Sequence, residues 1–287
     1  MPTIDANGIQ LYYEEHGEGE PLLLIMGWGG NASTWHPQLP GLAERFRVIA
    51  FDNRGVGRSS APQGPYSIPT MAGDALALLD ALRLPRAHVF GISMGGMIAQ
   101  ELALGHPERV DALVLGCTSP GGRRAAGFRE LQKNIQEFAD SHSDDMPGLV
   151  WFSDFLKRLW TARALAKSDA NLQDFVLSLI RHPATAHGLR SQSEAIARHD
   201  TYDRLPQIDK PTLIITGDKD ELIDFENSFI LAGRIPNAEL RIFPGLKHAF
   251  HLEEPALVNE VIIDFIARSR RVAAQRSTAT ATRAGSA

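Results

Sequence analysis

Residues 87–104 read AHVFGISMGGMIAQELAL and contain the pentapeptide Gly91-Ile92-Ser93-Met94-Gly95, of the form Gly-x-Ser-x-Gly. An apolar run precedes the pentapeptide, and small residues with helical spacing follow it. A serine on a sharp turn between a strand and a helix has its hydroxyl pushed out of the packed layers. Glycine is required on both sides because a Cβ there would collide across the turn. The stretch therefore predicts a strand, a tight turn with Ser93 at its tip, and a helix.

On both sides of this stretch, short apolar runs alternate with helical patterns. Short runs that are apolar throughout are typical of parallel strands buried on both faces. Their alternation with helices predicts an α/β fold, with a mostly parallel sheet flanked by helices on both faces. The predicted strands are residues 9–15 (of mixed polarity, which suits an edge), 21–26, 47–51, 87–91, 110–117, 212–216 and 239–243, and the predicted helices are residues 34–45, 70–82, 94–104 and 256–267.

The alternation stops between residues 119 and 205, where no strand pattern is found. We predict a core formed by residues 1–118 and 206–268, with an all-helical segment, residues 119–205, inserted between its two parts. Two stripes at helical spacing contain Phe152, Phe155, Leu156, Leu159 and Trp160, and then Leu172, Phe175, Val176 and Leu179. Such stripes mostly serve packing. The alternative is that some aromatic residues line a pocket, and the candidates are Trp151, Phe155 and Trp160.

The composition is that of a globular protein: 287 residues, 44% hydrophobic and 22% charged. The net charge of -5 gives no reason to expect nucleic acid as a partner. The single cysteine, Cys117, excludes a disulfide framework and ends an apolar run, which favours a buried structural thiol. The ten histidines show no metal-binding spacing, so neither a metal nor a cofactor is expected.

We expect no signal peptide at the N-terminus. The N-terminus lacks the basic and apolar regions of a signal peptide, and no apolar run approaches the roughly 20 residues of a membrane helix. We therefore expect no membrane association and a cytoplasmic protein. Residues 269–287 are rich in Arg, Ser, Thr and Ala, with few large apolar side chains, which predicts a disordered tail.

A serine at such a turn is a candidate nucleophile, but its hydroxyl needs a base, and the base needs an orienting acid. When the serine lies on such a turn of an α/β sheet, the acid and the histidine follow it along the chain. Asp218 and Asp220 follow the strand at 212–216. Asp220 is favoured because it reaches further into the loop, whereas Asp218 suits a turn and Asp224 suits the start of a helix.

The base is predicted in the loop after the last strand, where His248 stands. His251 is the alternative, but it lies nearer the closing helix, where packing or capping is expected. The negative charge that develops on the substrate oxygen needs backbone amides as donors. One candidate is Met94, directly after the serine, and the other is Trp28 in the glycine-rich loop 26–30, with Gly29 as the alternative.

With these residues in place, the chain resembles the α/β-hydrolase superfamily. The resemblance covers residues 5–268 and rests on Met26–Gly30, Phe51–Ser59, Gly91–Gly96, Gly217–Asp220 and Gly245–Pro255. It implies the α/β-hydrolase fold, with the helical lid inserted after the sixth strand and lying over the active site. It also makes the glycines at 55 and 57 part of a structural turn and not a phosphate site. The chain departs from the family at Met26, where relatives often have histidine.

The segments 35–40 and 64–68 are similar to 3-oxoadipate enol-lactonases and related esterases. The resemblance implies a serine hydrolase that cleaves ester or lactone bonds of small, largely apolar molecules through Ser93, His248 and Asp220. Alternatives on the same residues are a C–C bond hydrolase, an acyltransferase and a cofactor-free haloperoxidase. A non-catalytic ligand receptor is an alternative of another class.

Overall fold

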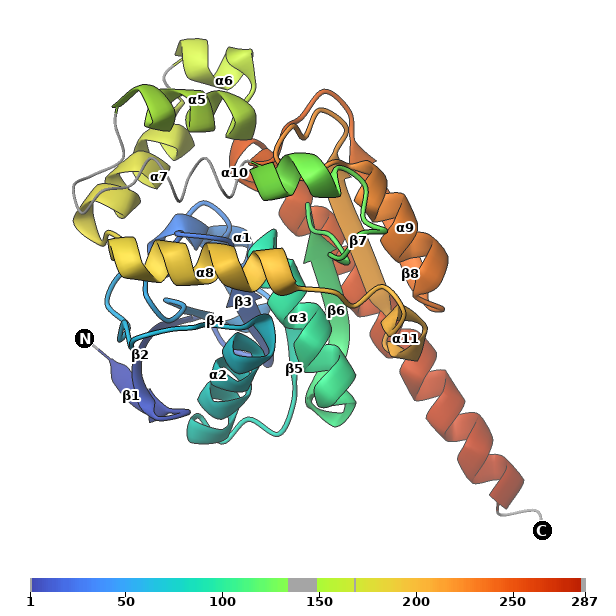
Figure 1. Ribbon diagram of the computed structural model, residues 1–287. Helices are drawn as coiled ribbons and strands as arrows, with labels where there is room; N and C mark the ends of the chain where they lie inside the picture. The colour runs from blue at the N-terminus through green and yellow to red at the C-terminus, as the bar shows by residue number, and fades with distance from the viewer. Residues whose placement is uncertain (1, 134–148, 168, 285–287) are drawn as a thin grey trace.

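The computed structural model describes residues 2–133, 149–167 and 169–284. Its eight strands form one sheet in the order β1-β2-β4-β3-β5-β6-β7-β8 (Figure 1). The pairs β1–β2 and β2–β4 are antiparallel and all other pairs are parallel. The predicted α/β fold with a mostly parallel sheet is therefore confirmed. The strands are β1 Thr3–Ala6, β2 Ile9–His16, β3 Glu20–Ile25, β4 Phe46–Phe51, β5 Ala87–Ile92, β6 Val110–Gly116, β7 Thr212–Gly217 and β8 Ala238–Phe243.

Strand β1 was not predicted, and β2 is not an edge strand because it lies between β1 and β4. The two strands of this hairpin are joined by Asn7 and Gly8, whose φ angles are 49° and 77°. Two positive φ angles are the signature of the tight hairpin turn that Asn-Gly favours. The hairpin could therefore have been predicted from the Asn7-Gly8 dipeptide in the sequence.

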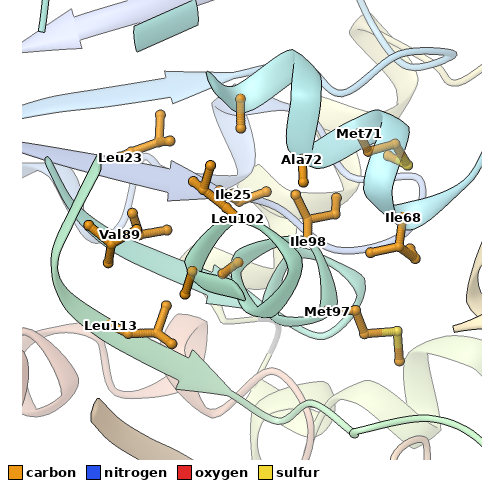
Figure 2. Close-up of a cluster of buried hydrophobic side chains, with 14 of the residues drawn as sticks. Leu23, Ile25, Ile68, Met71, Ala72, Val89, Met97, Ile98, Leu102 and Leu113 are labelled. Atoms are coloured by element: carbon orange, nitrogen blue, oxygen red, sulfur yellow. The ribbon is translucent and has the colours of Figure 1, made fainter. Parts of the chain in front are cut away.

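Each face of the sheet is covered by helices because successive side chains of a strand point to opposite faces. In β3, Leu23 and Ile25 pack against α2 and α3, whereas Leu22 and Leu24 pack on the face of α1 and α11. Figure 2 shows the first cluster, in which side chains of β3, β5 and β6 meet those of α2 and α3. The helices of the core are α1 Leu39–Ala43, α2 Ile68–Ala81, α3 Met94–Gly105, α9 Glu226–Arg234, α10 Phe250–Glu253 and α11 Pro255–Ala284.

The helix predicted over residues 34–45 is divided into two short pieces, a 3₁₀ helix at Ala32–Trp35 and α1. Pro37 and Pro40 explain the division. A proline has no backbone N–H to donate to the carbonyl four residues earlier, so it interrupts the hydrogen bonds of a continuous helix.

Between β6 and β7 the described part of the lid is helical, with α5 Leu149–Leu159, α6 Ala162–Lys167, α7 Ala170–Arg181 and α8 Ala186–Arg198. An isolated bridge pairs Gly121 with Asp200, so the two ends of the lid lie side by side. The loops after β3 and β4 hydrogen-bond to the lid: Asn31 donates to the carbonyl of Ser178 at 3.0 Å. Figure 1 shows α5 and α6 at the top of the view, α7 below them, and α8 running across the molecule above β3 and β4.

Helix α11 continues to Ala284, past residue 268, where a disordered tail was expected. No glycine or proline interrupts residues 256–284, and the alanines of this segment favour a helix. Arg268 also bonds Asp264 one turn earlier at 3.0 Å and Glu239 of β8 at 2.9 Å. The helix therefore extends from a segment that is anchored to the sheet (Figure 1). Among the described residues, no helix has the length and apolar character needed to cross a membrane.

Candidate active site

Ser93 lies at the turn between β5 and α3, with φ 55° and ψ −121°. A non-glycine residue at such angles is strained by about 1–3 kcal/mol, which the surrounding elements must offset. The two flanking glycines permit the turn, as expected. A Cβ on Gly91 would lie 2.2 Å from the carbonyl oxygen of Gly95, and a Cβ on Gly95 would lie 2.0 Å from that of Ile25. Any larger residue would push the strand, the turn and the helix apart.

Asp220 and His248 form a buried pair. Nδ1–H of His248 donates to Oδ2 of Asp220 at 2.7 Å. The other carboxylate oxygen, Oδ1, accepts from the backbone amides of Leu222 at 2.8 Å and Ile223 at 3.0 Å. Three hydrogen bonds thus fix the carboxylate, and the carboxylate fixes the tautomer and orientation of the imidazole. Burial lowers the pKa of His248, but the negative charge of Asp220, its hydrogen bond to the imidazole and the interactions with Cys117 together raise this pKa well above 6.5.

The two alternative acids have other partners. Oδ1 of Asp218 accepts from the backbone amide of Gly245 at 2.6 Å and so joins the loops after β7 and β8. Oδ1 of Asp224 accepts from the amide of Glu226 at 3.0 Å, at the start of α9. Asp218 therefore links two loops, and Asp224 stabilises the beginning of a helix. Among the carboxylates of the described residues, Asp220 and not Asp218 or Asp224 hydrogen-bonds to His248.

His251, the alternative base, is buried beside Trp35 and Phe250, with ring centroids 5.6 Å away in both cases. Burial lowers its pKa to about 3. The imidazole is therefore neutral at physiological pH and packs between aromatic rings.

Cys117 lies between the serine turn and His248 and shows that the two are close to each other. It directly follows β6, and the amide of Ser93 donates to the carbonyl of the residue before it, Gly116, at 2.8 Å, so Cys117 lies next to the serine turn. Its Sγ lies 3.7 Å from Nε2 of His248. Within the described part of the chain, no hydrogen bond joins the Ser93 hydroxyl to His248. Catalytic hydrogen bonds are often long before substrate binds, so this geometry is compatible with a triad.

The side chain of Cys117 is 1% exposed, which confirms the expectation of a buried thiol. Burial raises the pKa of the thiol, so it stays neutral. The donor atoms of Cys117, Asp220 and His248 lie within 4.8 Å of one another. Because Asp220 and Nδ1 of His248 bond to each other, Sγ and Nε2 are the two donors that remain. Zinc sites in enzymes use about three protein ligands, so this group fits a metal poorly.

The glycine-rich loop 26–30 lies against Ser93, since a Cβ on Gly27 would come within 3.1 Å of the Cβ of Ser93. Met94 opens α3, so its amide has no acceptor within the helix. The amide of Gly29, the alternative donor, is engaged by Oε1 of Gln192 at 3.0 Å. Trp28 and Met94 therefore stay the candidate donors, on the two backbone segments that flank the serine.

The three lid aromatics differ. Phe155 is half-buried and its ring lies 5.9 Å from that of Trp28, in an edge-to-face arrangement. Trp160 is 0% exposed, among apolar residues such as Leu172 and Leu252, so it serves packing and does not line an open pocket. The side chain of Trp151 lies outside the described part of the structure.

Two residues at the site were not predicted. Nδ2 of Asn53 donates to the carbonyl of Met26 at 2.9 Å, and Gln192 holds Gly29. Asn53 lies in the segment 51–59, which the sequence analysis assigned to a structural turn, so its position near other loops could have been predicted but its bond to Met26 could not. Gln192 lies on a lid helix, 163 residues from Gly29 along the chain, and no local pattern indicates this contact.

Comparison with known proteins identifies the family of the chain. A family model described as alpha/beta hydrolase fold matches residues 20–255. The protein named "Putative carbamate hydrolase RutD" from Azorhizobium caulinodans is 35% identical over 92% of this chain and 98% of its own length. The "3-oxoadipate enol-lactonase 2" of Acinetobacter baylyi is 28% identical over 91% of this chain and 94% of its own.

Among solved structures, the enol-lactonase from Burkholderia xenovorans LB400 superposes with a TM-score of 0.82 at 28% identity, covering 93% of this chain and 100% of that one. The matched segment includes the serine turn, the lid and both loops of the acid–histidine pair. This chain is a hydrolase, and it belongs to the α/β-hydrolase family.

Proposed function

We propose that this hydrolase cleaves carboxylic ester or lactone bonds of small, largely apolar substrates through an acyl-enzyme on Ser93. The observation that carries the proposal is the buried bond of 2.7 Å between Nδ1 of His248 and Asp220. It leaves Nε2, which faces the neighbourhood of Ser93 and Cys117, as the nitrogen that can accept a proton.

In the proposed mechanism, the substrate carbonyl oxygen is bound by the amides of Trp28 and Met94. Nε2 of His248 takes the proton of the Ser93 hydroxyl as Oγ attacks the carbonyl carbon. The imidazolium, stabilised by Asp220, then donates this proton to the leaving alkoxide oxygen. Water, deprotonated by His248, attacks the acyl carbon, the bond to Oγ of Ser93 breaks as the acid leaves, and the imidazolium returns its proton to Oγ. For a lactone, the alcohol and the acid leave as one molecule.

The half-buried ring of Phe155 beside Trp28 supports a preference for apolar groups, because it places aromatic surface next to the proposed carbonyl site. The names of the relatives support the bond type, since enol-lactonases occur both among the similar sequences and among the similar structures. The natural substrate is expected to be a small molecule, with no cofactor taking part.

The test is hydrolysis of a short p-nitrophenyl ester by the wild type and by Ser93→Ala. Loss of the nucleophile should lower kcat by at least about 10³-fold while the folded state is kept. A fluorophosphonate probe should label the wild type on Ser93 and leave the variant unlabelled. Full turnover by Ser93→Ala, or a wild type that neither turns over nor reacts with the probe, would exclude the proposal.

A carbamate is the second candidate substrate, and the name of the relative from Azorhizobium caulinodans favours it. The carbonyl of a carbamate can be attacked by the same serine, with an amine or ammonia leaving in place of an alcohol. A panel of esters, lactones, carbamates and vinylogous diketones separates these possibilities by kcat/KM. The diketones test for C–C bond cleavage.

A further inference from the structure

A buried side chain of the lid, that of Gln192, hydrogen-bonds to the loop that holds Trp28. Gln192 of α8 is 0% exposed. Its Oε1 accepts from the backbone amide of Gly29 at 3.0 Å, and its Nε2 donates to the backbone carbonyl of Arg54 at 2.9 Å. The side chain thus bridges the loop after β3 and the loop after β4.

The two bonds also fix which way the amide of Gln192 points. A backbone N–H can only donate and a backbone carbonyl can only accept, so Oε1 must face Gly29 and Nε2 must face Arg54. No apolar side chain can make either bond, and a carboxylate can make only the first.

Helix α8 is a rigid support for this side chain because its backbone rests directly on the core. A Cβ on Gly188 would lie 2.2 Å from the carbonyl oxygen of Gly55. At the start of the helix, the amide of Thr185 donates to that same carbonyl at 3.1 Å. The indole N–H of Trp28 adds a bond of 3.1 Å to the carbonyl of Leu189.

The peptide unit that carries the N–H of Trp28 lies between two anchored points. On one side, Asn53 bonds the carbonyl of Met26 at 2.9 Å. On the other side, Gln192 bonds the amide of Gly29, a residue with φ +69° that the loop needs in order to turn. Fixing both neighbours limits the rotation of the peptide between Gly27 and Trp28.

We propose that Gln192 is a positioning residue for the oxyanion hole: the lid, through this side chain, orients the Trp28 amide toward the developing negative charge. The inference rests on the proposed function and assigns the lid a role in the chemical step. A donor to an oxyanion contributes about 10²–10³-fold to kcat, and a misplacement of about 1 Å in an active site can cost about 10²-fold. Loss of the anchor should therefore lower kcat more than it raises KM.

The test compares Gln192→Met with Gln100→Met, a matched control. Gln100 is also 0% exposed and also bridges two segments, donating to the carbonyl of Ser119 at 3.1 Å and accepting from Oγ1 of Thr201 at 2.6 Å. Within the described part of the chain, its side-chain partners are Ser119 and Thr201, neither of which belongs to the loop 26–30. Gln192→Met should lower kcat by about 10-fold or more, with KM changed by less than about threefold. Gln100→Met, assayed where it is folded, should keep kcat.

A second variant, Gln192→Glu, gives a signature that loss of packing does not. When protonated, the introduced carboxyl can accept from Gly29 and donate to the carbonyl of Arg54, as glutamine does. When ionised, it faces that carbonyl with a second acceptor. The ratio of kcat between Gln192→Glu and wild type should therefore fall as pH rises from about 5.5 to 8.5, as expected for a buried carboxyl whose charged form is disfavoured. Gln192→Met should show a flat ratio.

Hydrogen exchange of the amides of residues 26–31 tests the anchor without any substrate. Exchange there should become faster in Gln192→Met and stay unchanged in Gln100→Met. If kcat falls equally in both variants, or exchange of this loop does not change, Gln192 is not a positioning residue. If the wild type neither turns over ester nor reacts with the fluorophosphonate, the proposed function fails, and the exchange result still decides whether the lid holds the loop.

Discussion

Asp220 and His248 meet because their loops leave neighbouring parallel strands at the same level. The last residue of β7, Gly217, pairs with the last residue of β8, Phe243. Asp220 and His248 follow these residues by three and five positions, and their side chains join at 2.7 Å. The sheet register therefore sets the acid–histidine contact.

This contact predicts the pH dependence of catalysis. The charge of Asp220 raises the pKa of His248 above 6.5, and the protonated imidazole cannot act as a base. In the free enzyme, kcat/KM should therefore rise with pH through that raised pKa. Asp220→Asn removes the charge, so the rise should move to lower pH. The amide would also donate to Nδ1 and favour the wrong tautomer, which lowers kcat by up to about 10⁴-fold. The pH profiles of both proteins check this. An unmoved acidic limb would contradict the assignment of His248.

The thiol of Cys117 should be inert in the folded protein, since it is 1% exposed and burial raises its pKa. Thiolates and not thiols react with iodoacetamide. Incubation with iodoacetamide at pH 7.5 should leave the folded chain unmodified by mass spectrometry and fully active. The unfolded chain should gain one carboxamidomethyl group, because the sequence contains one cysteine. Rapid alkylation of the native protein would show that the thiol is accessible.

The contact between α8 and the core predicts a steric effect. Gly188→Ala would place a Cβ 2.2 Å from the carbonyl oxygen of Gly55, so backbone must move. We expect the free energy of unfolding to fall by about 1–3 kcal/mol, together with a lower kcat. Gly233→Ala in α9 is the control, since nothing lies within 4 Å of its Cβ position. That variant should gain about 0.5–1 kcal/mol from its helix propensity. Urea unfolding curves measure both, and equal stabilities would contradict the contact.

We expect Phe155 and Trp160 of the lid to differ in role: the first affects substrate preference and the second affects stability. Phe155 borders Trp28, so Phe155→Ala should change the ratio of kcat/KM between short and long acyl esters. Trp160 is fully buried, so Trp160→Ala should lower the free energy of unfolding by about 3–5 kcal/mol. Its folded fraction should keep the wild-type acyl preference. Urea unfolding curves measure the stability of Trp160→Ala, and a series of p-nitrophenyl esters, assayed below the unfolding temperature, measures the acyl preference of both variants. A change of acyl preference in Trp160→Ala alone would reverse the two roles.

The parts of the fold that could be predicted are those with local signals. The turn at Ser93 needs two glycines within five residues, and the parallel strands are short apolar runs. The Asn7-Gly8 turn also has a local signal, although the strand before it is only four residues long. The extension of α11 beyond residue 268 was not predicted. The segment has few large apolar residues, which indicated disorder, although it also contains no glycine or proline before Gly285 to end a helix.

The support of the glycine-rich loop could not be predicted in the same way. Met26 removes the side chain that relatives often use, and the replacement contacts come from far along the chain. Gln192 is 163 residues from Gly29 and 138 from Arg54. Only the folded chain, in which α8 rests on the loops after β3 and β4, brings these groups together.

The bridge between Gly121 and Asp200 closes the inserted segment at its base. The chain thus leaves the core and returns to it at nearly one point, which is the geometry that allows a segment to be exchanged as a module. A chimera that received its inserted segment from another family member would acquire a different lid. It would at the same time lose Gln192, whose hydrogen bond supports the glycine-rich loop. Grafts into this core should therefore be chosen by whether the donor segment carries a side-chain amide at the position of Gln192, and not by the shape of the cavity alone.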